Sequence, residues 1–541
     1  MTSPLHHAGA VGRTLGRGIP RARWAVVALS LALVFWTGFS AVRSTNFGGY
    51  DEWLVVSLTS RGIVGFPYAN RPLALAWALP GVLGLPSGLG AYLLAHTAWL
   101  FLSGLVVLAI ARRLAPGAPR LAALAAAFAL TWAPLDAHRL NPLNNLEYSG
   151  ATLAALLALL LLLEWAAGGR RAFLAGAFLC AFVAARSYEG TMGLLGPGGA
   201  VLLLALGEHR RRPAGVVLTA WAGALAGVAA AVALPLVSSP TGSYQLSGLR
   251  FSLEPGGVLT RLVQQAGWHL GPLAAAPPLW SGRLVAAAAA MAMALVASPA
   301  GEGVPRRRLA WLGAAGLGLG VAAWSPLLLT PATVAPAKMQ GLSAPGFGLM
   351  LAVGTLLAAS LLPGRARLPA TLALSCGLVA LGTARTLALQ REWDERSAFP
   401  VQRLLLDRLV SLAPDLREGT LVVLVDADGV FPATFTFRHA VSYLYGGRAA
   451  GLVHGGYDFL YPARFDTDGV ATLPWPVVRE PWREPAHVYG YDALVVVRQA
   501  GGELTLERAW PADLPSAPGT AGYAPLARIV RGGRRACIPA E

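Results

Sequence analysis

Long apolar runs dominate the first 389 residues of the chain. Runs of about 17–24 residues recur from Trp24 to Leu389, and each is about long enough to cross a hydrocarbon core roughly 30 Å thick. Two runs, 121–135 and 172–186, are short and need to extend or tilt. The pattern predicts about eleven membrane-spanning helices, at 24–42, 89–111, 121–135, 148–165, 172–186, 191–207, 215–237, 283–298, 309–330, 346–362 and 369–388.

Basic residues cluster between the apolar runs, on alternate connections. This is the positive-inside pattern, which places the N-terminus in the cytoplasm and, after an odd number of spans, the C-terminus outside. The pattern also accounts for the net charge of +16, so we reject a nucleic-acid partner. The clusters are Arg13/Arg17/Arg21/Arg23, Arg112/Arg113/Arg120, Arg170/Arg171, Arg210/Arg211/Arg212, Arg306/Arg307/Arg308 and Arg365/Arg367.

The composition agrees with a membrane protein. Hydrophobic residues make up 55% of the chain, above the average of a soluble domain. No clear cleavage site follows the first apolar run, so we expect an uncleaved helix in a bacterial plasma membrane. The cysteines have neither a metal-binding nor a disulfide spacing. They are Cys180, Cys376 and Cys537.

Beyond Arg391 the apolar runs become short and acidic residues become frequent. Thr420–Val425 and Ala493–Val497 are predicted to be buried strands, and the second is predicted to form a hairpin with Glu503–Arg508. Helical spacing covers Gln402–Leu412. The fold class is therefore mainly α, a polytopic transmembrane bundle with a small extracytoplasmic α/β domain. The expected division is a basic segment at 1–23, a membrane domain at 24–390 and a soluble domain at 391–541.

Acidic residues are rare before residue 390, where nine of the 27 occur. Two of them, Asp51 and Glu52, are adjacent, although a carboxylate costs roughly 2.5–3.5 kcal/mol to insert into a bilayer. We therefore expect this pair to be the chemical centre. Three of the nine border the cytoplasmic arginines, namely Glu164, Glu208 and Glu302, and the outside set is Asp51, Glu52, Asp136, Glu147, Glu189 and Glu254.

The outside loops are predicted at 43–88, 136–148, 238–282 and 331–345, with a short one at 186–190. The first contains an amphipathic stretch, Arg71–Trp77, suited to the membrane interface. Structural roles remain open for the polar residues of these loops. These roles are a solvated pair at Asp51–Glu52, a helix-end ion pair of Asp136 with Arg139, an i,i+3 pair of Arg186 with Glu189, and a Lys338 that extends to the surface.

For two features of the soluble domain, we prefer a structural interpretation to a functional one. Asp426 and Asp428 form a D-x-D that suits a metal, but they follow a strand and favour a turn. The tyrosines and tryptophans of this domain suit sugar stacking, but they also suit a small core or docking on the membrane.

The arrangement resembles the C-type (GT-C) membrane glycosyltransferases, which include aminoarabinose, mannosyl and arabinosyl transferases that use polyprenyl-phosphate sugars. The resemblance covers roughly residues 20–390. It rests on a cytoplasmic N-terminus, a long first outside loop that opens with Asp51–Glu52, the sequence Asn70-Arg71-Pro72-Leu73 and an acidic second outside loop.

The resemblance implies a catalytic carboxylate at Asp51, a neighbouring acid at Glu52 and a second-loop acid at Asp136. It implies no cofactor firmly, because the first loop lacks a D-x-D, and a divalent metal stays open. Candidates for binding the donor phosphate are Arg71, Arg139, Arg186 and Lys338. Substrate contacts are expected from Tyr50, His138, Asn145, Glu147, Tyr188 and Glu189.

The expected reaction is sugar transfer from a polyprenyl-phosphate donor to a glycan, lipid or protein acceptor outside the membrane. A carboxylate acts as base on the acceptor hydroxyl, and cations stabilise the departing phosphate. One base without a carboxylate nucleophile predicts inversion. The alternatives are a transporter or flippase, which predicts polar residues at mid-membrane and often internal repeats, and a non-catalytic assembly protein for envelope precursors.

Overall fold

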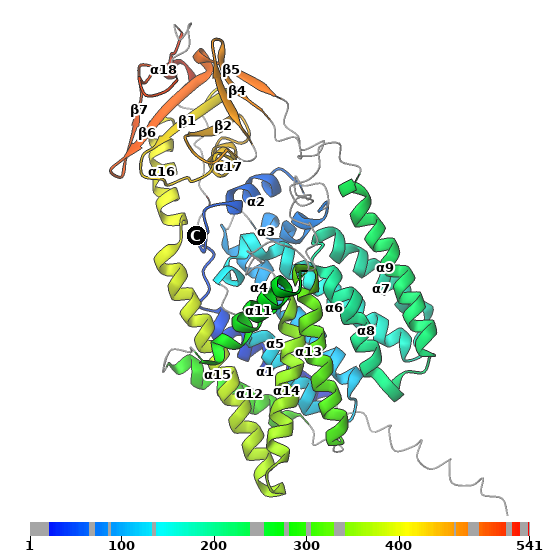
Figure 1. Cartoon of the computed structure of the whole chain (residues 1–541). Coiled ribbons are helices and arrows are strands. Elements are labelled where there is room, and N and C mark those ends of the chain that lie inside the picture. The colour runs from blue at the N-terminus through cyan, green and yellow to red at the C-terminus, as the bar shows by residue number, and fades with distance from the viewer. Residues whose placement is uncertain are drawn as a thin grey trace, which may run out of the picture.

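The computed structural model describes most of the chain. The described residues are 21–63, 71–84, 88–132, 137–237, 254–274, 281–298, 304–328, 341–458, 461–473, 486–515, 522–530 and 539. The protein is mainly helical, with a long bundle at one end and a small domain with two sheets at the other (Figure 1).

Helices stand at all eleven predicted positions. Among the described residues, eight segments are long and apolar enough to cross a membrane, which makes this a membrane protein. They belong to α1 (Arg21–Phe39), α4 (Gly90–Leu114), α6 (Pro142–Ala166), α8 (Thr191–Leu206), α9 (Ala214–Val237), α13 (Arg306–Leu328), α14 (Ala344–Ser360) and α15 (Gly364–Arg396). Three further helices are shorter, at 13, 17 and 16 residues: α5 (Pro119–Thr131), α7 (Arg171–Ser187) and α12 (Gly282–Ala297).

The shortest of these helices, α5, lies in the centre of the bundle. Every residue of α5 except Arg120 is buried, and its neighbours are α4, α14 and α1. Small residues permit this close packing, as they do in many membrane interfaces. The same holds for α13 and α14, where a Cβ atom on Gly346 would lie only 2.2 Å from the backbone nitrogen of Gly320.

Two connections that were predicted to be outside loops contain helices. In the first connection, α2 (Asp51–Ser60) is followed by the 3-10 helix η2 (Ala74–Ala78) and by α3 (Leu79–Leu83). The stretch around Trp77 packs on α6. The contact is so close that a side chain on Gly150 would overlap the Trp77 ring. In the connection after α9, α11 (Pro255–Ala274) is a 20-residue amphipathic helix. The loop prediction was wrong there because glycines and prolines at both ends obscure its periodicity.

The last membrane helix continues into the small domain. The prediction ended it at residue 388, but α15 extends to Arg396 because Leu389–Arg396 contains good helix formers that tolerate water. A break at Ser397 separates it from α16 (Phe399–Leu412). The charged end of α15 thus connects the bundle to the small domain, which lies beyond one end of the bundle (Figure 1).

The small domain is built on a four-stranded sheet with strand order β2-β1-β6-β7. The central strand β1 is parallel to both of its neighbours, and β7 is antiparallel to β6. The strands are β1 (Thr420–Asp426), β2 (Ala449–His454), β6 (Leu494–Ala500) and β7 (Glu503–Leu506), with α17 (Thr434–Leu444) packed on β2. These bounds confirm the two predicted strands and the hairpin, and α16 confirms the predicted helix.

A second sheet was not predicted, because its strands have only four residues each and lie between turns. It is antiparallel, with order β3-β4-β5. Its strands are β3 (Ala463–Asp466), β4 (Gly469–Thr472) and β5 (His487–Gly490). The short 3-10 helices η4 (Ala137–Leu140), η5 (Gly207–His209) and η7 (Tyr491–Ala493), and the single turn α18 (Pro525–Arg528), complete the described elements.

The small domain and the first outside connection share one hydrophobic core. Helix α17 packs on α2, and the Trp53 indole nitrogen donates to the Gln402 amide oxygen at 2.8 Å. The Thr436 hydroxyl lies 3.2 Å from the carbonyl oxygens of Gly49 and Tyr50. The segment that carries Asp51 is therefore clamped between the membrane bundle and the small domain.

We expect Gln402→Leu to weaken this clamp. Gln402 and Trp53 are fully buried, and Gln402 also donates to the Val430 carbonyl oxygen at 3.2 Å. Leucine leaves an indole N–H and a carbonyl unpaired, which costs about 2–4 kcal/mol of unfolding free energy. Thermal unfolding in detergent, followed by limited proteolysis of the small domain, measures the loss. Asp407→Leu, on the exposed face of the same helix, is the control; equal stability of the two variants would contradict the clamp.

Candidate functional site

The adjacent carboxylates Asp51 and Glu52 occupy different environments at the start of α2. Glu52 is fully buried. One of its oxygens accepts from the Gly48 backbone N–H at 2.6 Å and from the Asn141 side-chain amide at 2.5 Å, and the other accepts from the Tyr50 N–H at 2.9 Å. Three donors therefore occupy the Glu52 carboxylate, which anchors the loop before α2. A proton transfer by Glu52 requires these bonds to break.

Asp51 lies beside this anchor and is partly exposed. It opens α2, where a carboxylate is favoured by the helix dipole. The helix that it opens, α2, packs on α6. Tyr50, expected to bind substrate, is 48% exposed, and its ring lies 6.5 Å from that of Phe435 in the small domain.

A buried ionic cluster brings together three predicted site residues from distant parts of the chain. The Arg71 guanidinium donates through Nε and Nη2 to the two oxygens of Glu189, at 2.8 Å each, and through Nη1 to Glu147 at 3.0 Å. Its Cζ atom also lies 4.9 Å from the ring centroid of Tyr188. The predicted substrate residues Glu147, Tyr188 and Glu189 thus surround one of the predicted phosphate ligands.

The electrostatics of this cluster are mutually stabilising. Burial by itself raises the pKa of Glu189, but the charge and hydrogen bonds of Arg71 outweigh it and hold that pKa below its usual range. Burial likewise opposes the charge on Arg71, and the two carboxylates raise its pKa well above the usual value. One guanidinium and two carboxylates leave a net charge of −1, so the cluster as it stands attracts cations more than phosphate. Phosphate binding by Arg71 stays a prediction.

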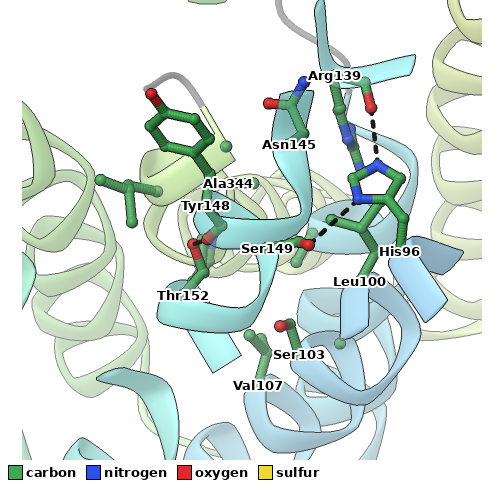
Figure 2. A pocket seen from close by; sticks show the side chains of 15 residues that line it. His96, Leu100, Ser103, Val107, Arg139, Asn145, Tyr148, Ser149, Thr152 and Ala344 are labelled. Carbon is green, nitrogen blue, oxygen red and sulfur yellow. Dashed lines mark hydrogen bonds between the residues drawn. The ribbon is translucent and has the colours of Figure 1, made fainter. Parts of the chain in front are cut away.

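A mainly apolar cavity begins next to this cluster. It lies between α4, α5, α6 and the start of α14, and its volume is about 50 Å³. Figure 2 shows Arg139, Asn145 and Tyr148 toward one end and Ser103 and Val107 toward the other. The Tyr148 ring also packs edge-on against Tyr188, with centroids 4.5 Å apart. Tyr148 therefore connects the cavity to the ionic cluster.

The polar end of the cavity is held by backbone contacts. The Arg139 guanidinium donates to the carbonyl oxygens of Trp132 and, at 3.0 Å, Leu130, which satisfies the last turn of α5. His96 of α4 bridges the Arg139 carbonyl oxygen at 2.9 Å and the Ser149 hydroxyl at 3.2 Å (Figure 2). The Asn145 amide donates to the Asn141 carbonyl at 3.0 Å.

The remaining predicted site residues are placed elsewhere or lie outside the described part of the chain. Arg186 donates to the Ala231 carbonyl at 2.7 Å, and Glu189 pairs with Arg71 rather than at i,i+3. Of His138 only the backbone is described, in η4. Asp136 and Lys338 lie outside the described residues, so the ion pair of Asp136 with Arg139 stays a prediction.

Three important residues were missed from the sequence, and two of them had a signal. His96 is a lone ionisable residue in an apolar run, which by itself marks a polar contact inside a membrane. Asn141 precedes Pro142, a typical start of a helix; its side chain accepts from the Asn144 N–H at 3.1 Å and donates to Glu52. Tyr148 had no signal, because only the packing of α6 turns it toward Asp51.

No metal site is apparent in the part of the chain that the structure describes, where His, Cys, Asp and Glu form no group of three. The D-x-D of the small domain forms the predicted strand-end turn. Asp426 accepts from the Phe431 N–H at 2.7 Å. Asp428 accepts from the N–H groups of Gly501 and Gly502, at 3.2 and 2.9 Å, and so holds the β6–β7 turn.

Comparison with known proteins adds no relative: no protein-family model matches the chain, and no curated protein matches it. The chemistry therefore rests on the geometry. Tyr148 lines an apolar cavity and follows Glu147 of the ionic cluster, and the partly exposed carboxylate of Asp51 opens a helix that packs on α6. Such a site can take a proton from a hydroxyl of an amphipathic substrate.

Removal of Arg71 should reverse the pH dependence of stability. In the wild type the pKa of Glu189 is lowered, so its contribution is complete above the unfolded pKa and is lost as pH falls through the folded pKa. In Arg71→Gln, buried Glu189 and Glu147 repel each other, and breaking the cluster costs about 3–5 kcal/mol at neutral pH. The folded pKa of Glu189 then rises, so the variant should gain stability between pH 7.5 and 5.5.

Thermal unfolding in detergent at several pH values measures both slopes. Over the same interval the wild type should show no gain from this cluster. The double variant Arg71→Gln/Glu189→Gln is the control and should lose most of the gain on acidification. A single variant with the pH profile of the wild type would disprove the role of the cluster.

Proposed function

We propose that the protein is a membrane glycosyltransferase of the GT-C type. It moves a sugar from a polyprenyl-phosphate donor to a glycan, lipid or protein acceptor at the outer face of a bacterial plasma membrane. The observation that carries the proposal is the position of Asp51. This partly exposed carboxylate opens α2 beside the buried Glu52, and α2 packs on α6, whose Tyr148 lines a mainly apolar cavity.

The proposed reaction is an inverting displacement. Asp51 takes the proton of the acceptor hydroxyl, whose oxygen forms a bond to the anomeric carbon of the sugar. The bond between that carbon and the donor phosphate oxygen breaks, and the phosphate leaves with the electron pair. Glu52 stays in its hydrogen bonds and fixes the backbone of the Asp51 loop, a division that its burial supports.

The donor is proposed to enter the cavity with its phosphate at the polar end. Arg139 and Asn145 line this end, and Leu100 and Val107 line the apolar part. A cation in such a dry site stabilises the charge of the departing phosphate more strongly than it would in water. Lys338 and Asp136, which belong to neighbouring outside loops, stay candidates for the same phosphate and for the acceptor.

The acceptor is proposed to approach from the small domain. Tyr50 is exposed on that side and faces Phe435, so an aromatic wall lies next to Asp51. Aromatic faces suit sugar rings, because they offer an apolar surface beside polar groups. The clamp between α2 and α17 keeps this wall in place.

The decisive variant is Asp51→Asn. It keeps the shape of the side chain but removes the base, so transfer should fall about 10²–10⁴-fold. A deletion strain is complemented with the wild type or with the variant at equal membrane abundance, and its envelope glycans and lipids are profiled by mass spectrometry. One sugar should be missing in both the deletion and the Asp51→Asn strain.

Two further variants separate chemistry from folding. Asp407→Asn removes an exposed carboxylate on α16 and should restore the full profile. Glu52→Gln places an amide against the donors of the loop and should lower the unfolding free energy by about 1–3 kcal/mol, whereas Asp51→Asn should lower it by less than about 1 kcal/mol, since it loses only the favourable charge at the start of α2. Full restoration by Asp51→Asn would sink the enzyme assignment and favour a transporter or an assembly protein.

A further inference from the structure

A second cavity lies at the opposite end of the bundle from the small domain. It is formed by the start of α5, the segment before α13 and the connection from α14 to α15. Its volume is about 260 Å³. This end carries the arginine clusters, so the positive-inside rule places it in the cytoplasm.

Arg120 lines this cavity and has no partner among the described residues. It is the residue of α5 that does not belong to the packed core, yet its Nε atom is shielded from solvent and has no hydrogen bond. Arg120 also forms no ion pair within the described part of the chain. A shielded guanidinium nitrogen without an acceptor is costly, and such groups usually mark an absent ion or water.

A second arginine approaches the same cavity from α15. Arg367 lines it. Among the described residues, its guanidinium donates one hydrogen bond, from Nε to the Leu362 carbonyl oxygen at 3.1 Å. Ser360, also in the lining, accepts from Arg306 at 3.2 Å. None of the described residues that line the cavity is acidic, and the nearby Glu164 is already paired with Arg113 at 2.9 Å. Among the described residues, the lining therefore carries positive charge and no negative charge.

The start of α5 adds to this positive field. Its N-cap residue, Ala118, offers no side-chain oxygen, and its first turn contains no acid. The free N–H groups of a helix start favour an anion. Residues 117–121 line the cavity, so an anion there would meet the helix start and two guanidinium groups together.

The remaining walls are apolar and continue into the expected membrane surface. Leu121, Leu309 and Leu356 line the inner part. At the mouth, Leu361 and Leu362 are 78% and 42% exposed on the turn between α14 and α15. Exposed leucines beside arginines are suited to the boundary between acyl chains and headgroups.

We propose that this cavity binds an anionic phospholipid of the cytoplasmic leaflet. The headgroup phosphate lies between Arg120 and Arg367 at the start of α5, and an acyl chain lies along the leucines. Basic pockets between membrane helices on the cytoplasmic side are suited to such headgroups. The site is separate from the outside cavity and is independent of the proposed enzyme activity.

The test uses the whole protein purified in detergent with added phosphatidylglycerol. The lipid-bound fraction is measured by native mass spectrometry, and the thermal shift is measured in parallel. Arg120→Gln/Arg367→Gln should lower the apparent affinity about 30-fold, since each arginine near the headgroup contributes about 1 kcal/mol. If the double variant does not fold, each single variant should still lose about fivefold.

Matched controls distinguish a built site from general charge attraction. Arg170→Gln/Arg171→Gln removes two exposed arginines from the same side of the membrane and should leave the affinity unchanged. Arg120→Lys/Arg367→Lys should keep most of it. Equal loss in both glutamine pairs, equal binding of phosphatidylcholine, or equal protection by inorganic phosphate would each overturn the proposal.

Discussion

The buried carboxylate of Glu52 holds together the parts of the protein that form the outside site. It accepts the N–H groups of Gly48 and Tyr50 and the side-chain amide of Asn141, so it joins the first outside loop to the start of α6. Charge-assisted bonds of this kind contribute more than neutral ones, roughly 1.5–3 kcal/mol each. A buried carboxylate is tolerable only when its oxygens are satisfied in this way.

Other contacts extend this anchor across the molecule. Asn46 donates to the Leu140 carbonyl at 2.7 Å and exchanges two amide hydrogen bonds with Gln390 of α15. The Ala398 N–H donates to the Phe47 carbonyl at 3.0 Å. The loop before α2 is thus fixed to α6, to the last membrane helix and to the small domain. These contacts fix the backbone of the residues before Asp51 and so restrict the positions open to its side chain.

The arginines at the two ends of the bundle have different surroundings. On the outside, Arg71 meets two carboxylates and Arg139 meets backbone carbonyls. On the side with the arginine clusters, Arg120 has no partner among the described residues. Because an arginine stays charged in any of these places, its neighbours decide its role. Arg71 and Arg139 thus already have acceptors within the protein, whereas Arg120 is the arginine that we propose binds a lipid phosphate.

The sequence by itself determined the membrane character, the positions of the membrane helices and the core strands of the small domain. These follow from local periodicity, and a run of apolar residues needs no distant partner to favour a bilayer. It also singled out Asp51–Glu52, because carboxylates are costly there. Only the tertiary structure decided which carboxylate is the anchor, since that depends on Asn141, 89 residues away along the chain. The pairing of Arg71 with Glu147 and Glu189 was likewise invisible, because charge complementarity has no sequence period and packing alone brings those loops together.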